Sequence, residues 1–356
     1  MELFVLSRRT TDLGPARGCV IEFEDVLAAT CGARLISPDL HFVPARVPRR
    51  LRHEKWTLPP ETLASMTRAK NAVGPRILLV SALHPGDLDL LKAIPNWRRH
   101  FDIVCAYIFD AVAPEPARAT LALLDHVFVP AQDALELFAP YCRKSLSFVP
   151  LACDVWKFGS SQPHRFIDLM GYGRQWRPHG DVFEQRWNQI GTERLYHHTV
   201  MVSHVISGHE AQRRLFWKML HRSQLALAYD LLWTGGTRFT YSMVSQRWFE
   251  SLAAGCVVVG RRPTCNEAQE LLGWQDATIE LPEDAGAACE TIESLWADAP
   301  RLEAARQRNY AMMLQHHDWR HRIAQILHQL QVALPPNLSH SLEELHARTT
   351  LLDTSL

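Results

Sequence analysis

The sequence predicts an α/β protein with two parallel-sheet domains in tandem. Short apolar runs alternate with helical-looking stretches along the whole chain, which is typical of parallel sheets covered by helices. Several of the runs are apolar almost throughout, as expected for strands buried on both faces. The length of 356 residues, at roughly 150 residues per domain, corresponds to about two domains.

Six runs in the first half of the chain predict strands. They cover residues 3–6, 34–37, 76–81, 102–108, 126–129 and 145–149. Between them, residues 86–94 and 131–139 have the apolar spacing of amphipathic helices. These elements together predict a first domain over residues 1–150.

Five runs predict strands in the second half, and three helices are expected to close it between residues 283 and 330. The predicted strands cover residues 165–171, 195–200, 224–229, 256–259 and 277–281. Turn-forming and polar residues cluster over residues 150–163, which indicates a domain boundary. The second domain is therefore predicted over residues 151–330, with residues 331–356 as a polar tail.

The composition excludes some classes of protein. With 38 basic and 38 acidic side chains, the chain lacks the cationic excess that a nucleic-acid wrapper needs, so no nucleic-acid partner is expected. No apolar run approaches the ~18–20 residues of a membrane span. The apolar start ends at Arg8, too early for a secretory signal. We therefore expect a cytoplasmic protein, with at most peripheral contact to the inner face of a membrane.

Neither cysteines nor histidines form a metal-binding motif. The eight cysteines are scattered through apolar segments without a C-x-x-C pair, and the 18 histidines include no H-E-x-x-H. The sequence therefore predicts no metal site and no cofactor.

The most informative stretch predicts a helix that ends at Gly255 and is followed by a buried strand. Ser242 or Ser245 can cap this helix, and apolar residues follow at intervals of four. Glu250 is expected close to the positive end of the helix, where its carboxylate can accept hydrogen bonds from both hydroxyls of a ribose. Arg247 and the helix amides then face a diphosphate. The alternative is that Glu250 is an ordinary acidic residue of the first helical turns.

A glycine loop follows the predicted strand at 165–171. Position 176, where the dinucleotide pattern G-x-G-x-x-G requires its third glycine, is Trp176, so a nicotinamide oxidoreductase is disfavoured. Arg174 and Arg177 stand beside the flexible backbone of Gly173 and can stabilise the charge of a leaving diphosphate. The alternative is a surface loop with solvated arginines.

These segments resemble the GT-B glycosyltransferases, specifically the group-one retaining type and its spore-maturation-protein-like relatives. The resemblance extends over about residues 76–330 and rests on four segments: the run from Arg247-Trp248-Phe249-Glu250 through Gly255, Val258 and Gly260; Pro150-Leu151-Ala152-Cys153-Asp154; Met170-Gly171-Tyr172-Gly173-Arg174; and the run around Trp319-Arg320. It implies two Rossmann-like, doubly wound domains facing a cleft. Residues 1–150 are then the acceptor domain, and residues 151–330, with a closing helix, are the nucleotide-sugar donor domain.

The resemblance also implies a function. A sugar would pass from a nucleotide-sugar donor to a glycan, lipid-linked, protein or small-molecule acceptor, without a metal and with retention. The expected donor-binding residues are Gly173, Arg174, Arg177, Ser242, Arg247 and Glu250. The family usually has a second Glu at position 242, where this chain has Ser242, so the donor sugar and the stereochemistry stay open. The alternative is a non-catalytic nucleotide-sugar-binding or assembly protein on the same fold.

Two polar residues of the first domain follow predicted strands, where ligands of open parallel sheets bind. They are His84 and Asp110, and by resemblance either can act near the reacting hydroxyl of the acceptor, so the expected catalytic residues are Asp110, His84 and Glu250. A helix cap or a turn residue is the alternative. A basic stretch can meet an anionic acceptor or lipid headgroup, or form a solvated loop; its members are Arg46, Arg49, Arg50, Arg52 and Lys55.

Overall fold

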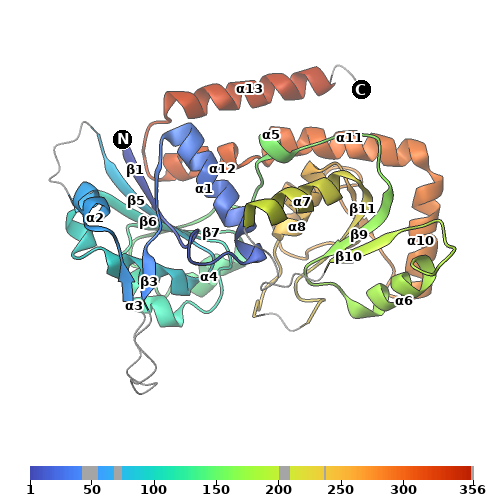
Figure 1. Ribbon diagram of the computed structural model, residues 1–356, viewed down its shortest axis with the longest axis horizontal. Coiled ribbons are helices and arrows are strands. Elements are labelled where there is room, and N and C mark those ends of the chain that lie inside the picture. The colour runs from blue at the N-terminus through green and yellow to red at the C-terminus, as the bar shows by residue number, and fades with distance from the viewer. Residues whose placement is uncertain (42–54, 68–73, 200–208, 236–237, 354–356) are drawn as a thin grey trace. The chain divides into compact units, whose positions relative to one another are not determined.

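The computed structural model describes residues 1–41, 55–67, 74–199, 209–235 and 238–353. The chain divides into two compact units, each built on its own parallel sheet (Figure 1). Unit 1 comprises Met1–Val149 and Ile323–Ser339, and unit 2 comprises Pro150–Arg322 and His340–Leu356. The predicted α/β class with two parallel sheets is confirmed.

The sheet of unit 1 has the strand order β2-β1-β5-β6-β7-β8, and all its described pairs are parallel. Its strands are β1 (Glu2–Leu6), β2 (Arg34–Ile36), β5 (Arg76–Ala82), β6 (Ile103–Ile108), β7 (His126–Val129) and β8 (Ser145–Phe148). The apolar runs bury as predicted, since every residue of β5 is buried. The helices are α1 (Gly18–Cys31), α2 (Pro60–Thr67), α3 (Arg118–Leu121) and α4 (Asp133–Phe138), and an antiparallel pair joins β3 (Asp39–His41) to β4 (Lys55–Thr57).

The sheet of unit 2 has the strand order β10-β9-β11-β12-β13, again with parallel pairs. Its strands are β9 (Ile167–Tyr172), β10 (Tyr196–Thr199), β11 (Ser223–Tyr229), β12 (Val257–Arg261) and β13 (Ile279–Glu280). Its helices are α5 (Val155–Phe158), α6 (Arg177–Trp187), α7 (His209–His221), α8 (Gln246–Ala253), α9 (Ala268–Leu271), α10 (Ala285–Ala297) and α11 (Ala299–His316).

Alternate residues of the unit 2 strands face different helices. Leu225, Leu227 and Tyr229 join the apolar core formed with α6 and α10. The other face meets α7 and α8, because Tyr172 of β9, which has the opposite parity to the core residue Leu169, packs edge-on against Phe216 of α7 and bonds to Ser251 of α8. This two-sided burial explains why the strands are apolar almost throughout.

The stretch at residues 86–94, which was predicted as an amphipathic helix, lies mostly in a 3₁₀ helix, η3 (Pro85–Ala93), and not in an α-helix. Its end bonds run between residues three apart, from the Asp87 amide to the His84 carbonyl and from the Ile94 amide to the Leu91 carbonyl. Such i→i+3 bonds tighten a helix and place its apolar residues differently from an α-helix.

The C-terminal region differs from the predicted boundaries. The last predicted helix is α12 (Trp319–Gln329), but the contacts of Ile323–Ser339 group with unit 1, so unit 2 does not continue unbroken to residue 330. Residues beyond 331 are not only a polar tail, since Pro336–Asp353 forms helix α13. Its residues Leu338 and Leu345 are buried, which explains why this segment folds against the protein.

Candidate functional site

The strand order of unit 2 has a switch point between β9 and β11. The chain continues from β9 outward to β10, whereas from β11 it continues in the other direction to β12. Ligands of open α/β sheets bind outside the carboxyl ends of the strands at such a point. Here these ends carry the loop of Gly173, after β9, and Asp230, directly after β11.

Gly173 allows a close approach to the loop after β9. Its φ of +65° lies in the left-handed region, which favours glycine. A Cβ atom at this position would lie 3.3 Å from Nη1 of Arg247. The glycine therefore lets a guanidinium pack directly against the loop.

Arg247, on α8, connects the two strand ends at the switch point. Its Nη1 donates to the carbonyl of Arg174 at 3.1 Å, and its Nη2 donates to the carbonyl of Tyr229 at 3.5 Å. The residue is only 9% exposed, and its Nε is buried without a hydrogen-bond partner. Burial lowers the pKa of Arg247 to about 10.

No carboxylate of the described residues forms an ion pair with Arg247. A buried cation without a counter-ion is costly, and such groups are normally paired. The guanidinium of Arg247 lies at the carboxyl ends of parallel strands and has an unsatisfied donor, so it is suited to bind an anion.

Glu250 follows Arg247 by three residues on α8, so the two share one side of the helix. Its Oε1 accepts a 2.6 Å hydrogen bond from Nη1 of Arg213, which comes from α7. Both side chains are largely buried, at 6% and 16% exposure for Glu250 and Arg213 respectively.

Tyr172, the last residue of β9, ties α8 to the sheet. Its hydroxyl donates to the carbonyl of Arg247 at 3.1 Å and lies 3.0 Å from Oγ of Ser251. Burial raises the pKa of Tyr172 well above its ordinary value, so the hydroxyl stays protonated and can donate. This contact fixes the turn of α8 that carries Arg247 and Glu250.

Ser242 lies in a buried cluster around Asp230. Oδ2 of Asp230 accepts from the Ser242 hydroxyl at 2.6 Å, and from the amide and hydroxyl of Thr264 at 3.0 and 3.2 Å. Oδ1 accepts from the amide of Leu232 at 2.9 Å. The cap expected from Ser242 falls elsewhere, because α8 begins after Ser245, whose side chain makes no capping bond. Ser242 instead holds the loops after β11 and β12 together.

The two loop arginines are more exposed than Arg247. Arg174 contributes its carbonyl to Arg247 and leaves its side chain exposed, and Arg177 is exposed as the first residue of α6. The structure thus gathers Gly173, Arg174 and Arg247 at one strand end, with Glu250 on the same helix as Arg247. Ser242 joins them through Asp230, the neighbour of Tyr229.

His84 and Asp110 lie at the ends of β5 and β6, which are neighbours in the sheet of unit 1. The amide of Asp110 donates to the carbonyl of Leu83 at 2.6 Å, which links the two strand ends. The His84 side chain is 44% exposed, and its Nδ1 lies 3.6 Å from Oδ1 of buried Asp87. The two predicted residues are therefore close in the fold. Of the basic stretch predicted to meet an anion, residues 46–52 lie outside the described residues, and Lys55 belongs to β4.

Sequence reasoning missed Asp230 and Arg213. Asp230 directly follows a predicted strand, so the strand-end rule that selected Asp110 could have found it. Arg213 lies in a basic run on α7 with no local pattern that distinguishes it from Arg214, and only the packing of α7 beside α8 reveals its partner.

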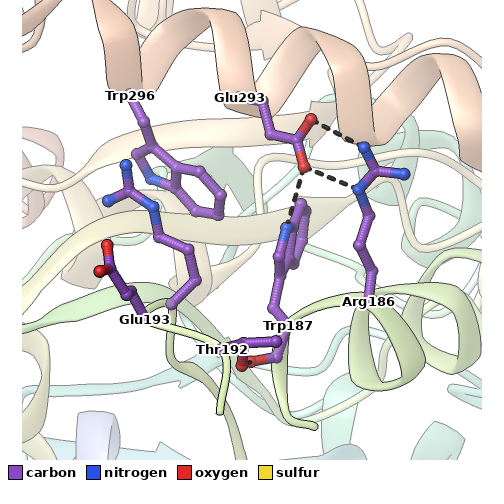
Figure 2. A pocket seen from close by; sticks show the side chains of 7 residues that line it. Arg186, Trp187, Thr192, Glu193, Glu293 and Trp296 are labelled. Carbon is purple, nitrogen blue, oxygen red and sulfur yellow. Dashed lines mark hydrogen bonds and ion pairs between the residues drawn. The ribbon is translucent and has the colours of Figure 1, made fainter.

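A separate pocket of about 470 Å³ lies in unit 2, near the amino end of β10 (Figure 2). Its lining residues are Arg186, Trp187, Thr192, Glu193, Arg194, Glu293 and Trp296. The guanidinium of Arg186 is held by both oxygens of Glu293 at 2.7 and 2.9 Å, and Arg194 pairs with Asp168 at 2.6 Å. Because its arginines are paired and it lies away from the carboxyl ends of the strands, this pocket is not the candidate anion site.

The described residues contain neither a cluster of metal ligands nor a helix that could span a membrane. Among them, no group of three or more His, Cys, Asp or Glu side chains is arranged to hold a metal ion. In the same part of the chain, no helix is both long and apolar enough to cross a membrane.

A glycosyl transferase-like family model matches residues 163–328, which include the switch-point residues described above. No curated protein sequence matches the chain at a significant level. Among solved structures, an α-glucosyltransferase in complex with UDP has a TM-score of 0.58 at 12% identity, over 93% of this chain and 100% of that chain. The chain has the GT-B fold. The parallel sheets of units 1 and 2 correspond to the two Rossmann-like domains of this fold.

Other solved structures support this GT-B assignment. HepE from Anabaena, in complex with UDP-glucose, has a TM-score of 0.54 at 12% identity, over 93% of this chain and 100% of that chain. The trehalose-6-phosphate synthase OtsA has a TM-score of 0.53 at 10% identity, over 94% of this chain and 100% of that chain. At these identities the similarity establishes the fold alone.

Proposed function

We propose that the protein is a glycosyltransferase that binds a nucleotide-sugar donor at the switch point of unit 2. The observation that carries this proposal is Arg247, a buried guanidinium with an unsatisfied Nε and no paired carboxylate among the described residues. A diphosphate supplies the missing counter-charge and the missing acceptor in one group.

The other predicted residues take complementary roles. Backbone amides of the Gly173 loop and the exposed side chains of Arg174 and Arg177 contact the diphosphate. Glu250 accepts hydrogen bonds from the ribose hydroxyls. Because arginines surround the leaving diphosphate, they can neutralise the charge that develops on it, and we propose transfer without a metal ion or other cofactor.

UDP is the first nucleotide to test. The α-glucosyltransferase similar to this chain is described in complex with UDP, and HepE in complex with UDP-glucose. These complexes, together with the family match over residues 163–328, support a UDP-sugar as donor. The resemblance of the Glu250 segment to the group-one type and its spore-maturation-protein-like relatives supports a retaining outcome.

His84 and Asp110 are the proposed acceptor residues. Both lie at neighbouring strand ends of unit 1, where an open parallel sheet binds ligands. The acceptor class stays open among a glycan, a lipid-linked molecule, a protein and a small molecule. Because the charge of the chain is balanced, we propose no nucleic-acid partner. We also propose that the protein is cytoplasmic, with at most peripheral contact to a membrane.

A second candidate function is nucleotide-sugar binding without turnover. One observation favours it. Group-one enzymes usually carry a second Glu at position 242, whereas this chain has Ser242, whose hydroxyl is already bonded to Asp230. Incubation with UDP-sugars distinguishes the two, since a binding protein releases no UDP even after long incubation with candidate acceptors.

Calorimetric titration of the protein with UDP tests the proposal. Wild type is expected to bind, and Glu250→Ala to bind about tenfold more weakly, because a hydrogen bond to a charged group is lost. Glu270→Ala, at an exposed position of α9, is the matched control and should bind as wild type does. Failure of the wild type to bind any nucleoside diphosphate would refute the proposal.

A further inference from the structure

The contact between Arg213 and Glu250 uses only one oxygen of the carboxylate. Oε1 of Glu250 lies 2.6 Å from Nη1 of Arg213, which is 37 positions away in the chain. Within the described part of the protein, Oε2 has no hydrogen-bond partner and is not among the fully buried polar atoms. The carboxylate therefore has one occupied and one available oxygen.

Arg213 is itself held in place by aromatic residues of its own helix. Its guanidinium carbon lies 5.0 Å from the ring centre of Phe216 and 5.2 Å from that of Trp217. Trp217 is 2% exposed and stacks on Phe158 with ring centres 5.0 Å apart and planes 2° from parallel. Because the guanidinium of Arg213 packs on these aromatic rings, of which Trp217 is buried, it has few alternative positions.

The same helix also reaches the strand end of the candidate site. Phe216 packs edge-on against Tyr172, with ring centres 4.9 Å apart. The hydroxyl of Tyr172 bonds to the carbonyl of Arg247 on α8. Through these contacts α7 and α8 are both fixed to Tyr172 at the end of β9, so the ion pair between the two helices has a defined position relative to this strand end.

We infer that Arg213 is a positioning residue, which orients the carboxylate of Glu250 so that Oε2 is presented to a ribose hydroxyl. The inference rests on the proposed function, in which Glu250 contacts the ribose. A charged hydrogen bond in a largely buried place fixes geometry more firmly than a solvated one. Without Arg213, the carboxylate would be a poorly compensated buried charge, free to rotate or to take up a proton.

Binding of two nucleotides tests the inference, with UDP and 2′,3′-dideoxyuridine diphosphate as probes. The wild type is expected to prefer UDP by about tenfold, the value of one hydrogen bond to a charged acceptor. Arg213→Met should lower this preference to about twofold and leave the affinity for the dideoxy probe nearly unchanged, since that probe has no ribose hydroxyls to orient. Arg213→Lys keeps the charge and should recover part of the preference.

Arg214→Met is the matched control, because the neighbouring Arg214 is 68% exposed and pairs only loosely with Glu210, at 3.8 Å. It should keep the full preference for UDP. If Arg213→Met keeps it too, or binds UDP more tightly than wild type, Arg213 does not position Glu250 and the inference is wrong. A wild type that binds UDP without preferring it also overturns the inference, whereas a wild type that binds neither probe overturns the proposed function itself.

Discussion

The hydroxyl of Ser242 donates a 2.6 Å hydrogen bond to Oδ2 of Asp230, and both residues are buried. Group-one glycosyltransferases usually carry a glutamate at the position of Ser242. In this chain a carboxylate already lies next to that position, supplied by Asp230 directly after β11, and it accepts two further hydrogen bonds from Thr264. This difference from the group-one pattern, which the Glu250 segment resembles, is thus part of the packing of the loops after β11 and β12.

Ser242→Glu is therefore expected to destabilise the protein. It would bring a second carboxylate into a buried cluster that contains no ion-paired cation among the described residues, at a cost of about 2–4 kcal/mol. Ser242→Ala, which removes only one hydrogen bond, should cost about 1 kcal/mol. Thermal unfolding measures both changes, and Asp230→Asn in the Ser242→Glu background should recover part of the loss. Wild-type stability of Ser242→Glu would contradict this account of the cluster.

Gly173→Ala is expected to weaken UDP binding more than it weakens the fold. The φ of +65° costs an L-residue about 1–2 kcal/mol, and the added Cβ would lie 3.3 Å from Nη1 of Arg247. The guanidinium must then shift away from the loop that we propose to hold the diphosphate. Gly191→Ala provides the comparison, since Gly191 also has a positive φ, of +96°, with nothing within 4 Å of its added Cβ. Equal UDP affinities for the two variants would show that the Gly173 contact does not matter for binding.

The buried carboxyl group of Glu24, on α1 of unit 1, is expected to make the free energy of unfolding depend on pH. Burial raises the pKa of Glu24 to about 7 from 4.5, against the opposing effects of Arg9 and Ser7. Between these two values the folded protein binds more protons at Glu24 than the unfolded chain does, so the contribution of Glu24 to stability falls as the pH rises from about 4.5 to 7. The melting temperature of Glu24→Gln, relative to wild type, should therefore increase over this range. A difference that stays constant with pH would mean that Glu24 titrates normally in the folded protein.

His84 and Asp110 should affect turnover without affecting the donor site. His84→Gln and Asp110→Asn are expected to leave the UDP affinity within about twofold, since both residues belong to unit 1. Release of UDP from a UDP-sugar should fall by about a hundredfold if either residue acts as a general acid or base. Unchanged turnover of both variants would remove these residues from the proposed chemistry.

The sequence predicted the sheets well because their signal is local. The apolar runs at 76–81 and 126–129 correspond to β5 and β7, and the helix that carries Arg247 and Glu250 ends before Gly255 as its cap predicts. The ends of the strands were likewise predictable. His84 and Asp110 were selected because each follows a predicted strand, and in the structure they lie close together.

What the sequence could not supply are partners fixed by packing between distant elements. The pairing of Arg213 with Glu250 joins two helices 37 residues apart, and the bond of Ser242 to Asp230 replaces a local cap with a contact between loops. Helix α13 was missed for a similar reason, since its composition resembles a polar tail, whereas Arg348 of this helix lies over the rings of Trp156 and Tyr310, far away in the chain.

The proposed function depends on the binding of a diphosphate by the buried cation Arg247. Calorimetric titration of Arg247→Met with UDP tests this role most directly. Removing the uncompensated buried charge offsets the loss of the hydrogen bonds to the carbonyls of Arg174 and Tyr229, so the free energy of unfolding of the variant should lie within about 1 kcal/mol of the wild-type value. Its UDP affinity should fall by about a hundredfold or more. Arg186→Met, at the exposed Arg186 paired with Glu293, controls for loss of a positive charge. An Arg247→Met variant that binds UDP as tightly as wild type would contradict the account.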